Sequence, residues 1–283
     1  MPRRHAARRR RIAVAAILLG LCGAGALWTL VVEPQWIVVT RTTIPITDLP
    51  EEFEGITIAL VADTHHGPWT GKGFVRRVAR RTSREKPDIV ALAGDFIHYS
   101  ARYAEPGIEP LGGIEAPLGT YAVLGNHDHW EGAEAVRAAL RRHGIAILEN
   151  AHAIVERGGA KLCIAGIQEI WEGAPDVSEA LAGVDPDVPR VLIVHNPDFV
   201  DTLGDTPRVD LVLAGHTHGG QVVLPFVGPL ILPARKEYAA GLVNLPHGLL
   251  YVTRGASEIT PPVRLGCRPE IAILTLVRAK GSP

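Results

Sequence analysis

The sequence predicts an α/β or α+β sandwich in one domain, preceded by a hydrophobic N-terminal helix. A chain of 283 residues with 47% hydrophobic content is long enough for one sizeable domain. In its first half, apolar segments rich in β-branched residues alternate with amphipathic helical segments, whereas the later apolar segments are joined by loops. Ahead of the domain, an uncharged segment of about 20 residues follows a cluster of arginines.

Residues 1–11 form a basic tail, expected in the cytoplasm, that contains six arginines and no acidic residue. Subtracting those six from the 29 basic residues of the chain leaves 23, against 30 acidic residues. A nucleic-acid-binding module needs a basic face to neutralise phosphates, so none is expected in this chain.

Residues 12–32 predict a transmembrane anchor, because an apolar helix of about 20 residues spans a hydrocarbon core of about 30 Å. The alternative is a cleaved signal peptide, whose apolar region is usually about 7–15 residues and ends in small residues. This segment is longer, which favours a retained anchor or an uncleaved signal. With the arginines in the cytoplasm, the pattern predicts a single-pass protein of the cell membrane whose domain is extracytoplasmic.

The domain is expected over residues 51–280, after a linker at 33–50 that contains three prolines and can add an edge strand. The first buried strand is predicted at 55–63, where the residues are apolar and β-branched. A helix is predicted at 71–87, with an apolar face opposite a row of arginines and with Pro87 at its end.

The remaining elements follow from the same patterns. Buried strands are predicted at 88–95 and 119–126, a helix at 132–144, and a β-hairpin around Gly158–Gly159. The last strands are expected at 189–196, 209–216, 248–255 and 269–277. Cys163 and Cys267 either pair in an oxidising compartment or remain free buried thiols, and no disulfide scaffold is indicated.

Polar residues follow five of these strands at their carboxyl ends. The segments are Asp63-x-His65, Gly94–Asp95, Gly125–Asn126–His127–Asp128, His195–Asn196 and Gly215–His216–Thr217–His218–Gly219–Gly220. One such residue alone is usually a helix cap or a turn residue. Five sets at successive strand ends instead indicate a ligand site, because ligands of open α/β sheets bind along this edge.

The residue types indicate a metal site. Carboxylate and imidazole together suit Mn, Fe or Zn, and the lack of cysteine ligands disfavours a structural zinc cage. Two cations about 3.5–4 Å apart would clamp a phosphoryl group and lower the pKa of a bridging water. The sequence therefore predicts two divalent metal ions as cofactors, with Mn, Zn and Fe all open.

The five segments resemble the motifs of the calcineurin-like metallophosphoesterase family, which run D-x-H, G-D, G-N-H-D/E, H and G-H-x-H. Here they read ADTHHG, AGDF, LGNHDHW, VHNPDF and AGHTHGGQ, in the family order. The anchor, the GHTHGGQ segment and the segment YVTRGASEITPPVRLGCRPEIAIL are similar to a membrane-associated bacterial subgroup. The resemblance implies a four-layer α/β/β/α sandwich of two mixed β-sheets flanked by helices.

The resemblance also implies roles for individual residues. The first metal ion would be bound by Asp63, His65 and His218, and the second by Asn126, His195 and His216, with Asp95 bridging both. His127 would donate a proton to the leaving group, and Asp128 would orient the His127 imidazole. His66 and Gly219 would contact the substrate, whereas His98 and His129 are expected at the rim of the site or in solvent.

The predicted function is hydrolysis of a phosphodiester by a metal-bridged hydroxide that attacks phosphorus. The anchor favours a lipid-linked or envelope substrate, because it holds the site close to the membrane. The alternatives are a phosphomonoester or nucleotide, the pyrophosphate of UDP-diacylglucosamine (which some relatives hydrolyse), and a catalytically silent metal-binding scaffold. The apolar segment 225–241 lies either at the mouth of the site or over the core, and the sequence does not define the oligomeric state.

Overall fold

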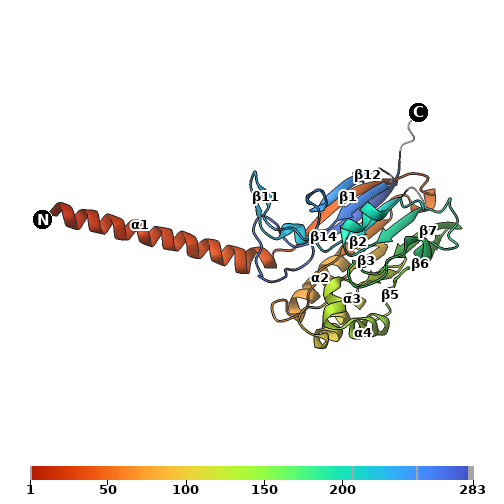
Figure 1. The fold of residues 1–283 in the computed structure, drawn as a ribbon, viewed down its shortest axis with the longest axis horizontal. Coiled ribbons are helices and arrows are strands. Elements are labelled where there is room, and N and C mark those ends of the chain that lie inside the picture. The colour runs from red at the N-terminus through yellow and green to blue at the C-terminus, as the bar shows by residue number, and fades with distance from the viewer. Residues whose placement is uncertain (1, 205–206, 247, 280–283) are drawn as a thin grey trace.

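The computed structural model describes residues 2–204, 207–246 and 248–279, so the predicted domain limit at residue 280 lies outside it. Helix α1 (Pro2–Leu27) continues through a π-type turn (Trp28–Val32) and a 3-10 turn (Glu33–Gln35). Figure 1 shows α1 projecting from one end of the domain. The segment Arg9–Gln35, which contains the predicted anchor, is long and apolar enough to cross a membrane, and its apolar stretch is not buried by the rest of the protein.

The first sheet has six strands in the order β1-β14-β2-β3-β4-β5. Its strands are β1 (Val38–Ile46), β2 (Thr57–Val61), β3 (Ile89–Ala93), β4 (Thr120–Val123), β5 (Ala146–Ile147) and β14 (Glu270–Arg278). Strand β14 runs antiparallel to β2, and the other neighbours are parallel. The carboxyl ends of β2, β3 and β4 therefore lie along one edge of the sheet.

The second sheet also has six strands, in the order β12-β13-β9-β8-β7-β6. Its strands are β6 (Ala151–Arg157), β7 (Ala160–Gly166), β8 (Arg190–Ile193), β9 (Leu211–Ala214), β12 (Gly241–Leu245) and β13 (Gly248–Val252). The four central strands are parallel, and the outer strands β6 and β12 are antiparallel to their neighbours. Both sheets are thus mixed, as predicted.

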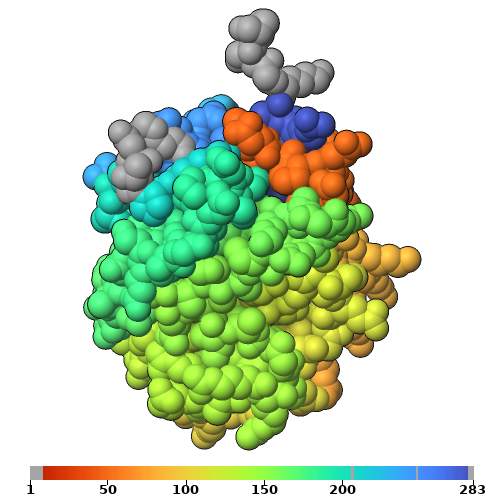
Figure 2. All heavy atoms as spheres, turned by 90° about the vertical axis from the view of Figure 1, so that its right-hand side faces the viewer, coloured from red at the N-terminus to blue at the C-terminus, as the bar shows by residue number. Residues whose placement is uncertain are grey.

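The layers follow from three hydrophobic cores. One core joins the facing sides of the two sheets and contains Leu60, Ile164 and Leu213. A second lies between the first sheet and the helices α2 (Lys72–Arg84), α3 (Ala104–Gly112) and α4 (Asn126–Arg142). The third covers the outer face of the second sheet beneath the short helix α5 (Val177–Ala180) and the 3-10 turn Pro197–Thr202. The predicted sandwich is confirmed, and Figure 2 shows the face of the domain opposite α1, where residues from the middle of the chain, in yellow and green, form most of the visible surface.

Half of the predicted linker at 33–50 is strand β1, an edge strand of the kind that the sequence allowed, and it pairs with β14 along all nine of its residues. Two local features differ from the sequence-based expectation. Helix α4 begins at Asn126 and not at residue 132, with its only non-helical residue at Gly132. Helix α3 was not predicted, because its sequence contains two prolines and two glycines. Buried Ile108 and Leu111 hold it against the sheet.

Candidate metal centre

The seven predicted metal ligands gather where the carboxyl edges of the two sheets meet. Asp63 and His65 follow β2, Asp95 follows β3, and Asn126 begins α4 just after β4. His195 follows β8, and both His216 and His218 follow β9. All seven side chains are buried, with at most 5% of the residue surface exposed. The structure therefore brings together residues that lie up to 155 positions apart in the chain.

Asp63, His65 and His218 form one cluster of ligand atoms, all within 4.8 Å of one another. The Nε2 atoms of His65 and His218 are 3.1 Å apart, and His218 Nε2 is 3.7 Å from Asp63 Oδ1. The His218 Nδ1–H group donates to the carbonyl oxygen of Ser257 at 2.9 Å. This bond leaves the Nε2 lone pair of His218 directed at the cluster, the usual arrangement for a metal-binding histidine.

Asp95, His195 and His216 form a second cluster. His195 donates its Nδ1–H to the carbonyl oxygen of Ala93 at 2.7 Å, so its Nε2 lone pair faces inward. That Nε2 atom lies 3.1 Å from Asn126 Oδ1 and 3.2 Å from His216 Nδ1. Asn126 thus supplies a neutral oxygen at the position predicted for a ligand.

Asp95 lies between the two clusters. Its Oδ2 atom is 3.4 Å from His65 Nε2 in the first cluster and 3.3 Å from His195 Nε2 in the second. Its other oxygen, Oδ1, accepts the backbone N–H of His127 at 2.9 Å. This is the position that a bridging carboxylate requires, since one oxygen faces both sets of imidazoles.

Burial and neighbouring charges set the protonation of the ligands. Burial raises the pKa of Asp63 to about 7. Burial also opposes the charge of Asp95, but the imidazoles of His195 and His65 outweigh it and hold the Asp95 pKa well below its usual value. Burial lowers the pKa of His216 to about 3 and those of the other buried ligand histidines, His65 and His218, well below their usual value. Neutral imidazoles offer the lone pairs that a metal ion needs.

His195 is the exception among the histidines. Burial opposes its charge, but the adjacent Asp95 carboxylate outweighs this and raises the His195 pKa to about 10.

Two carboxylates and four imidazoles packed at these distances are costly to bury without a cation among them. In addition, Nδ1 of His65 is buried without a hydrogen-bond partner among the described residues. The residues present therefore fit a pair of divalent metal ions.

Backbone strain is concentrated at the same residues. Five of the seven predicted ligands have positive φ angles: Asp63 (56°), His65 (38°), Asp95 (55°), His216 (71°) and His218 (51°). Such angles are uncommon for non-glycine residues and cluster at functional sites, where the surrounding structure maintains them. Gly125 shows how tight the packing is, because a Cβ at this position would lie 2.2 Å from Asp95 Oδ1.

The comparison with known protein families agrees with this geometry. Residues 56–220 match the family model described as "Calcineurin-like phosphoesterase", and this span contains all seven predicted ligands and His127. The chain belongs to the calcineurin-like phosphoesterase family. It is therefore a metal-dependent phosphoric ester hydrolase with clustered histidine and aspartate ligands, and members of this family use a dinuclear metal centre.

Several curated proteins are similar to this calcineurin-like phosphoesterase over most of its length. "Uncharacterized metallophosphoesterase YkuE" of Bacillus subtilis (strain 168) is 32% identical over 271 residues, which cover 92% of this chain and 94% of YkuE. "Phosphodiesterase YaeI" of Escherichia coli (strain K12) is 30% identical over 256 residues, covering 87% of this chain and 90% of YaeI.

Two further similarities are more limited. "Transmembrane protein with metallophosphoesterase domain" of Danio rerio is 32% identical over 269 residues, which cover 90% of this chain but only 60% of the fish protein. Among solved structures, the sulfate thiohydrolase SoxB of Thermus thermophilus superimposes with a TM-score of 0.51 at 15% identity, covering 81% of this chain and 57% of SoxB. The SoxB similarity supports the fold alone.

The role predicted for Asp128 is wrong. Its carboxylate does not contact the His127 imidazole, because both oxygens accept backbone N–H groups, from Gly125 at 3.0 Å, Asp95 at 2.8 Å, Phe96 at 2.8 Å and Ile97 at 3.2 Å. Asp128 lies in the first turn of α4, and its carboxylate is buried against the loop that follows β3. Its hydrogen bonds fix the backbone of Asp95, so it positions the predicted bridging ligand.

His98, which was expected at the rim of the site or in solvent with no contact assigned to it, is buried and contacts the His127 imidazole in place of Asp128. The Nδ1 atoms of His98 and His127 are 3.0 Å apart, and the two rings pack edge to face. Burial lowers the pKa of His98 to about 4, and the nearby His127 acts in the same direction. His98 is therefore a neutral partner that can hold one orientation of the His127 ring. The sequence does contain one indication that His98 belongs to the site, since it lies three residues after Asp95 on the same loop.

A pair of tryptophans also lies at the edge of the centre. Trp130 and Trp171 are about half exposed, and their rings stack with centroids 6.3 Å apart. Trp130 packs against His127 and Trp171 against His216, so the pair links the two sides of the centre. Trp130 had no predicted role, and Trp171 comes from the loop after β7.

The two residues predicted to contact substrate, His66 and Gly219, both pack closely against other residues of the protein. The Nδ1–H group of His66 donates to the carbonyl oxygen of Tyr103 at 2.9 Å, and its side chain packs against Gly107 of α3. Gly219 has φ 60°, and a Cβ there would lie 2.6 Å from Cys267 Sγ. Substrate contact by His66 and Gly219 stays a prediction. Cys163 and Cys267 are free buried thiols, which was one of the two expected alternatives.

An apolar pocket of about 200 Å³ lies beside the metal centre. His218 forms part of its wall, and the other walls include Leu230, Ile231, Pro261 and Val263. Leu230 and Ile231 follow the short hairpin formed by β10 (Val223–Leu224) and β11 (Gly228–Pro229). Residues of segment 225–241 therefore line a pocket next to His218, and a location at the mouth of the site stays a prediction.

Proposed function

We propose that the chain hydrolyses a phosphodiester that is lipid-linked or otherwise part of the cell envelope, with two divalent ions of Mn, Zn or Fe as cofactors. The observation that carries this proposal is the apolar pocket that shares His218 with the metal centre. A phosphoryl group at the clusters would place an attached apolar chain beside Leu230 and Ile231. Burial of such a chain stabilises the complex in proportion to the apolar area removed from water.

The protein side of the chemistry follows from the residues already described. Two divalent ions, when bound, neutralise the phosphoryl oxygens and lower the pKa of water. Asp63, His65 and His218 would hold one ion and Asn126, His195 and His216 the other, with Asp95 shared. His127, half-buried beside His65, would donate a proton to the leaving oxygen, and His98 would hold its ring.

The β10–β11 hairpin supports a substrate drawn from the membrane. Phe226 and Val227 at its tip and Ile231 after it are strongly exposed apolar residues. Two backbone hydrogen bonds connect the hairpin to the π-type turn that follows α1. Val223 donates its N–H to the carbonyl oxygen of Leu265, and the adjacent Arg264 donates its N–H to the carbonyl oxygen of Thr29. An exposed apolar loop next to a membrane anchor suits contact with lipid.

The proposal is tested with the full chain in detergent, loaded in turn with Mn²⁺, Zn²⁺ or Fe²⁺. Four substrates are compared: a lipid-linked diester, a water-soluble diester, a phosphomonoester and UDP-diacylglucosamine. The lipid-linked diester should give the highest kcat/KM, and an Asp95→Asn chain serves as the inactive control. A preference for the monoester or for the pyrophosphate would establish the corresponding alternative, and no hydrolysis with any metal would favour the scaffold.

We also propose that the domain lies on the extracytoplasmic side of the cell membrane. The support is the distribution of charge, since six arginines precede the apolar helix and no acidic residue offsets them. Alkaline phosphatase fused to the C-terminus should be active, and a green fluorescent protein fused there should be dark. The opposite pair of results would place the domain in the cytoplasm.

A further inference from the structure

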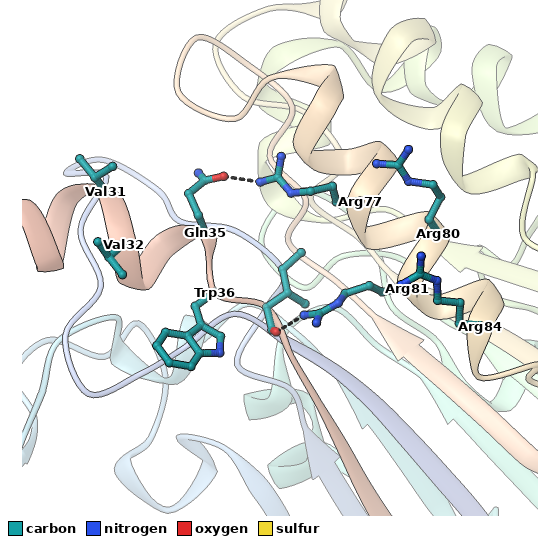
Figure 3. Close-up of a pocket in the computed structure, with 9 residues that line it drawn as sticks. Val31, Val32, Gln35, Trp36, Arg77, Arg80, Arg81 and Arg84 are labelled. Atoms are coloured by element: carbon teal, nitrogen blue, oxygen red, sulfur yellow. Dashed lines mark hydrogen bonds between the residues drawn. The ribbon is translucent and has the colours of Figure 1, made fainter.

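A groove of about 800 Å³ lies between the end of the apolar N-terminal segment and helix α2, far along the chain from the metal ligands of the second sheet. One wall consists of Val31, Val32, Gln35, Trp36 and Ile37. The other wall consists of four arginines of α2: Arg77, Arg80, Arg81 and Arg84. Figure 3 shows these arginines along one side of α2, opposite the segment that leaves α1.

The helical repeat explains why the four arginines share a wall. Their spacing of three or four residues places them on one face of α2, and the opposite face buries Phe74, Val75 and Val78. Helix α2 contains six basic residues and no acidic residue. The neighbouring acids are occupied, because Glu85 pairs with Arg41 and Glu109 pairs with Lys72.

The arginines differ in how they are held. Arg77 donates to the Gln35 side chain and Arg81 donates to the Ile37 carbonyl oxygen, so both are fixed against the opposite wall. Arg80 and Arg84 are exposed, and within the residues that the structure describes they make no ion pair or side-chain hydrogen bond. Four like charges around one groove repel one another unless an anion lies among them.

The position of the groove identifies the anion. The uncharged residues 12–32 span about 30 Å as a helix, which matches a hydrocarbon core and places Gln35 and Trp36 at the depth of the lipid headgroups. Trp36 packs against Trp28 near the end of this segment, and tryptophans are enriched at membrane interfaces. Guanidinium groups bind phosphate through paired hydrogen bonds, and exposed Val31 continues the groove with an apolar surface.

We propose that this groove binds the phosphate headgroup of an anionic phospholipid of the membrane that α1 spans. The arginines bind the phosphate, and the acyl chains run along the Val31–Val32 side of the helix. The bound lipid fixes how the domain sits on the bilayer, and hence the approach of the hairpin to the membrane surface. The site is separate from the metal centre and does not depend on hydrolysis.

The test measures lipid binding to the full chain in a neutral detergent after treatment with EDTA, so that no phosphodiester is consumed. Phosphatidylglycerol and phosphatidylcholine with the same acyl chains are titrated separately, and inorganic phosphate is added as a competitor. Arg80→Ala/Arg84→Ala should bind phosphatidylglycerol at least about tenfold more weakly than the native chain. Phosphatidylcholine binding should be weak in both proteins, and millimolar phosphate should not displace the lipid.

The matched control is Arg76→Ala/Arg141→Ala, which removes the same charge from exposed positions of α2 and α4 outside the groove. All proteins keep the N-terminal arginines, so those residues contribute equally throughout. The control should bind phosphatidylglycerol within about twofold of the native chain. Equal weakening in both double variants, or none in either, would overturn the proposal. Displacement by inorganic phosphate would also overturn it, since the site would then recognise free phosphate.

Discussion

The metal centre differs from the end of the domain that carries the α2 groove and the β10–β11 hairpin in how the side chains are held. At the metal centre the predicted ligands are buried, and His195 and His218 each use one ring nitrogen to bind a backbone carbonyl oxygen. At the groove and the hairpin, Arg80, Phe226 and Ile231 are exposed. The proposed chemistry thus relies on a fixed interior, whereas the proposed substrate preference and membrane contact rely on exposed residues.

The largest effect is expected from Asp95→Asn. Its carboxylate faces both clusters, so a neutral amide should weaken metal binding on both sides and lower turnover of every substrate by at least about 10⁴-fold. Metal content measured by plasma mass spectrometry should fall together with activity. A variant that retains two metal ions per chain would remove Asp95 from the bridging position.

His127→Ala should leave metal content unchanged and lower kcat by about 10²–10⁴-fold, the usual contribution of a positioned proton donor. The loss should be smaller for a substrate whose leaving group is already a good one, such as a nitrophenolate. That comparison separates proton donation from a structural effect. An equal loss for good and poor leaving groups would contradict the role of His127 as the acid.

Local patterns predicted most of the strands, and the family motifs supplied the individual metal ligands that we expect. Apolar β-branched runs form β2 and β3 in the first sheet and β8 and β9 in the second, and the polar residues after them gather where the carboxyl edges of the two sheets meet. Helix α3 could not be read in this way. Its prolines and glycines give no helical pattern, and its stability comes from tertiary burial of Ile108 and Leu111.

Side-chain partners within the site were less predictable than its composition. Asp128 is adjacent to His127 in sequence, yet the start of α4 directs its carboxylate to the amides of the β3 loop. His98 reaches His127 from that loop, 29 residues away. Contacts between loops depend on the register of β3 and β4, which the order of residues does not specify.

In the exposed region after the β10–β11 hairpin, Ile231→Asn should weaken the hydrolysis of lipid-linked substrates only. The side chain lines the apolar pocket beside His218, and replacing it with a polar group should raise KM for a lipid-linked diester by about tenfold. Hydrolysis of a water-soluble diester should not change. Ile154→Asn, on the partly exposed strand β6, is the matched control and should change neither. Equal effects on both substrates would mean that the pocket supports the metal centre itself.

The smallest effect is expected from His98→Phe. This substitution tests whether the contact between His98 and His127 contributes to turnover. Phenylalanine keeps the ring packing but removes the Nδ1 contact with His127, and one neutral hydrogen bond is worth about 0.5–1.5 kcal/mol. We therefore expect kcat to fall by about 2–10-fold, with KM and metal content unchanged. In a His127→Ala background the same substitution should have no further effect, because its partner is already absent. Additive losses in the double variant would show that His98 acts independently of His127.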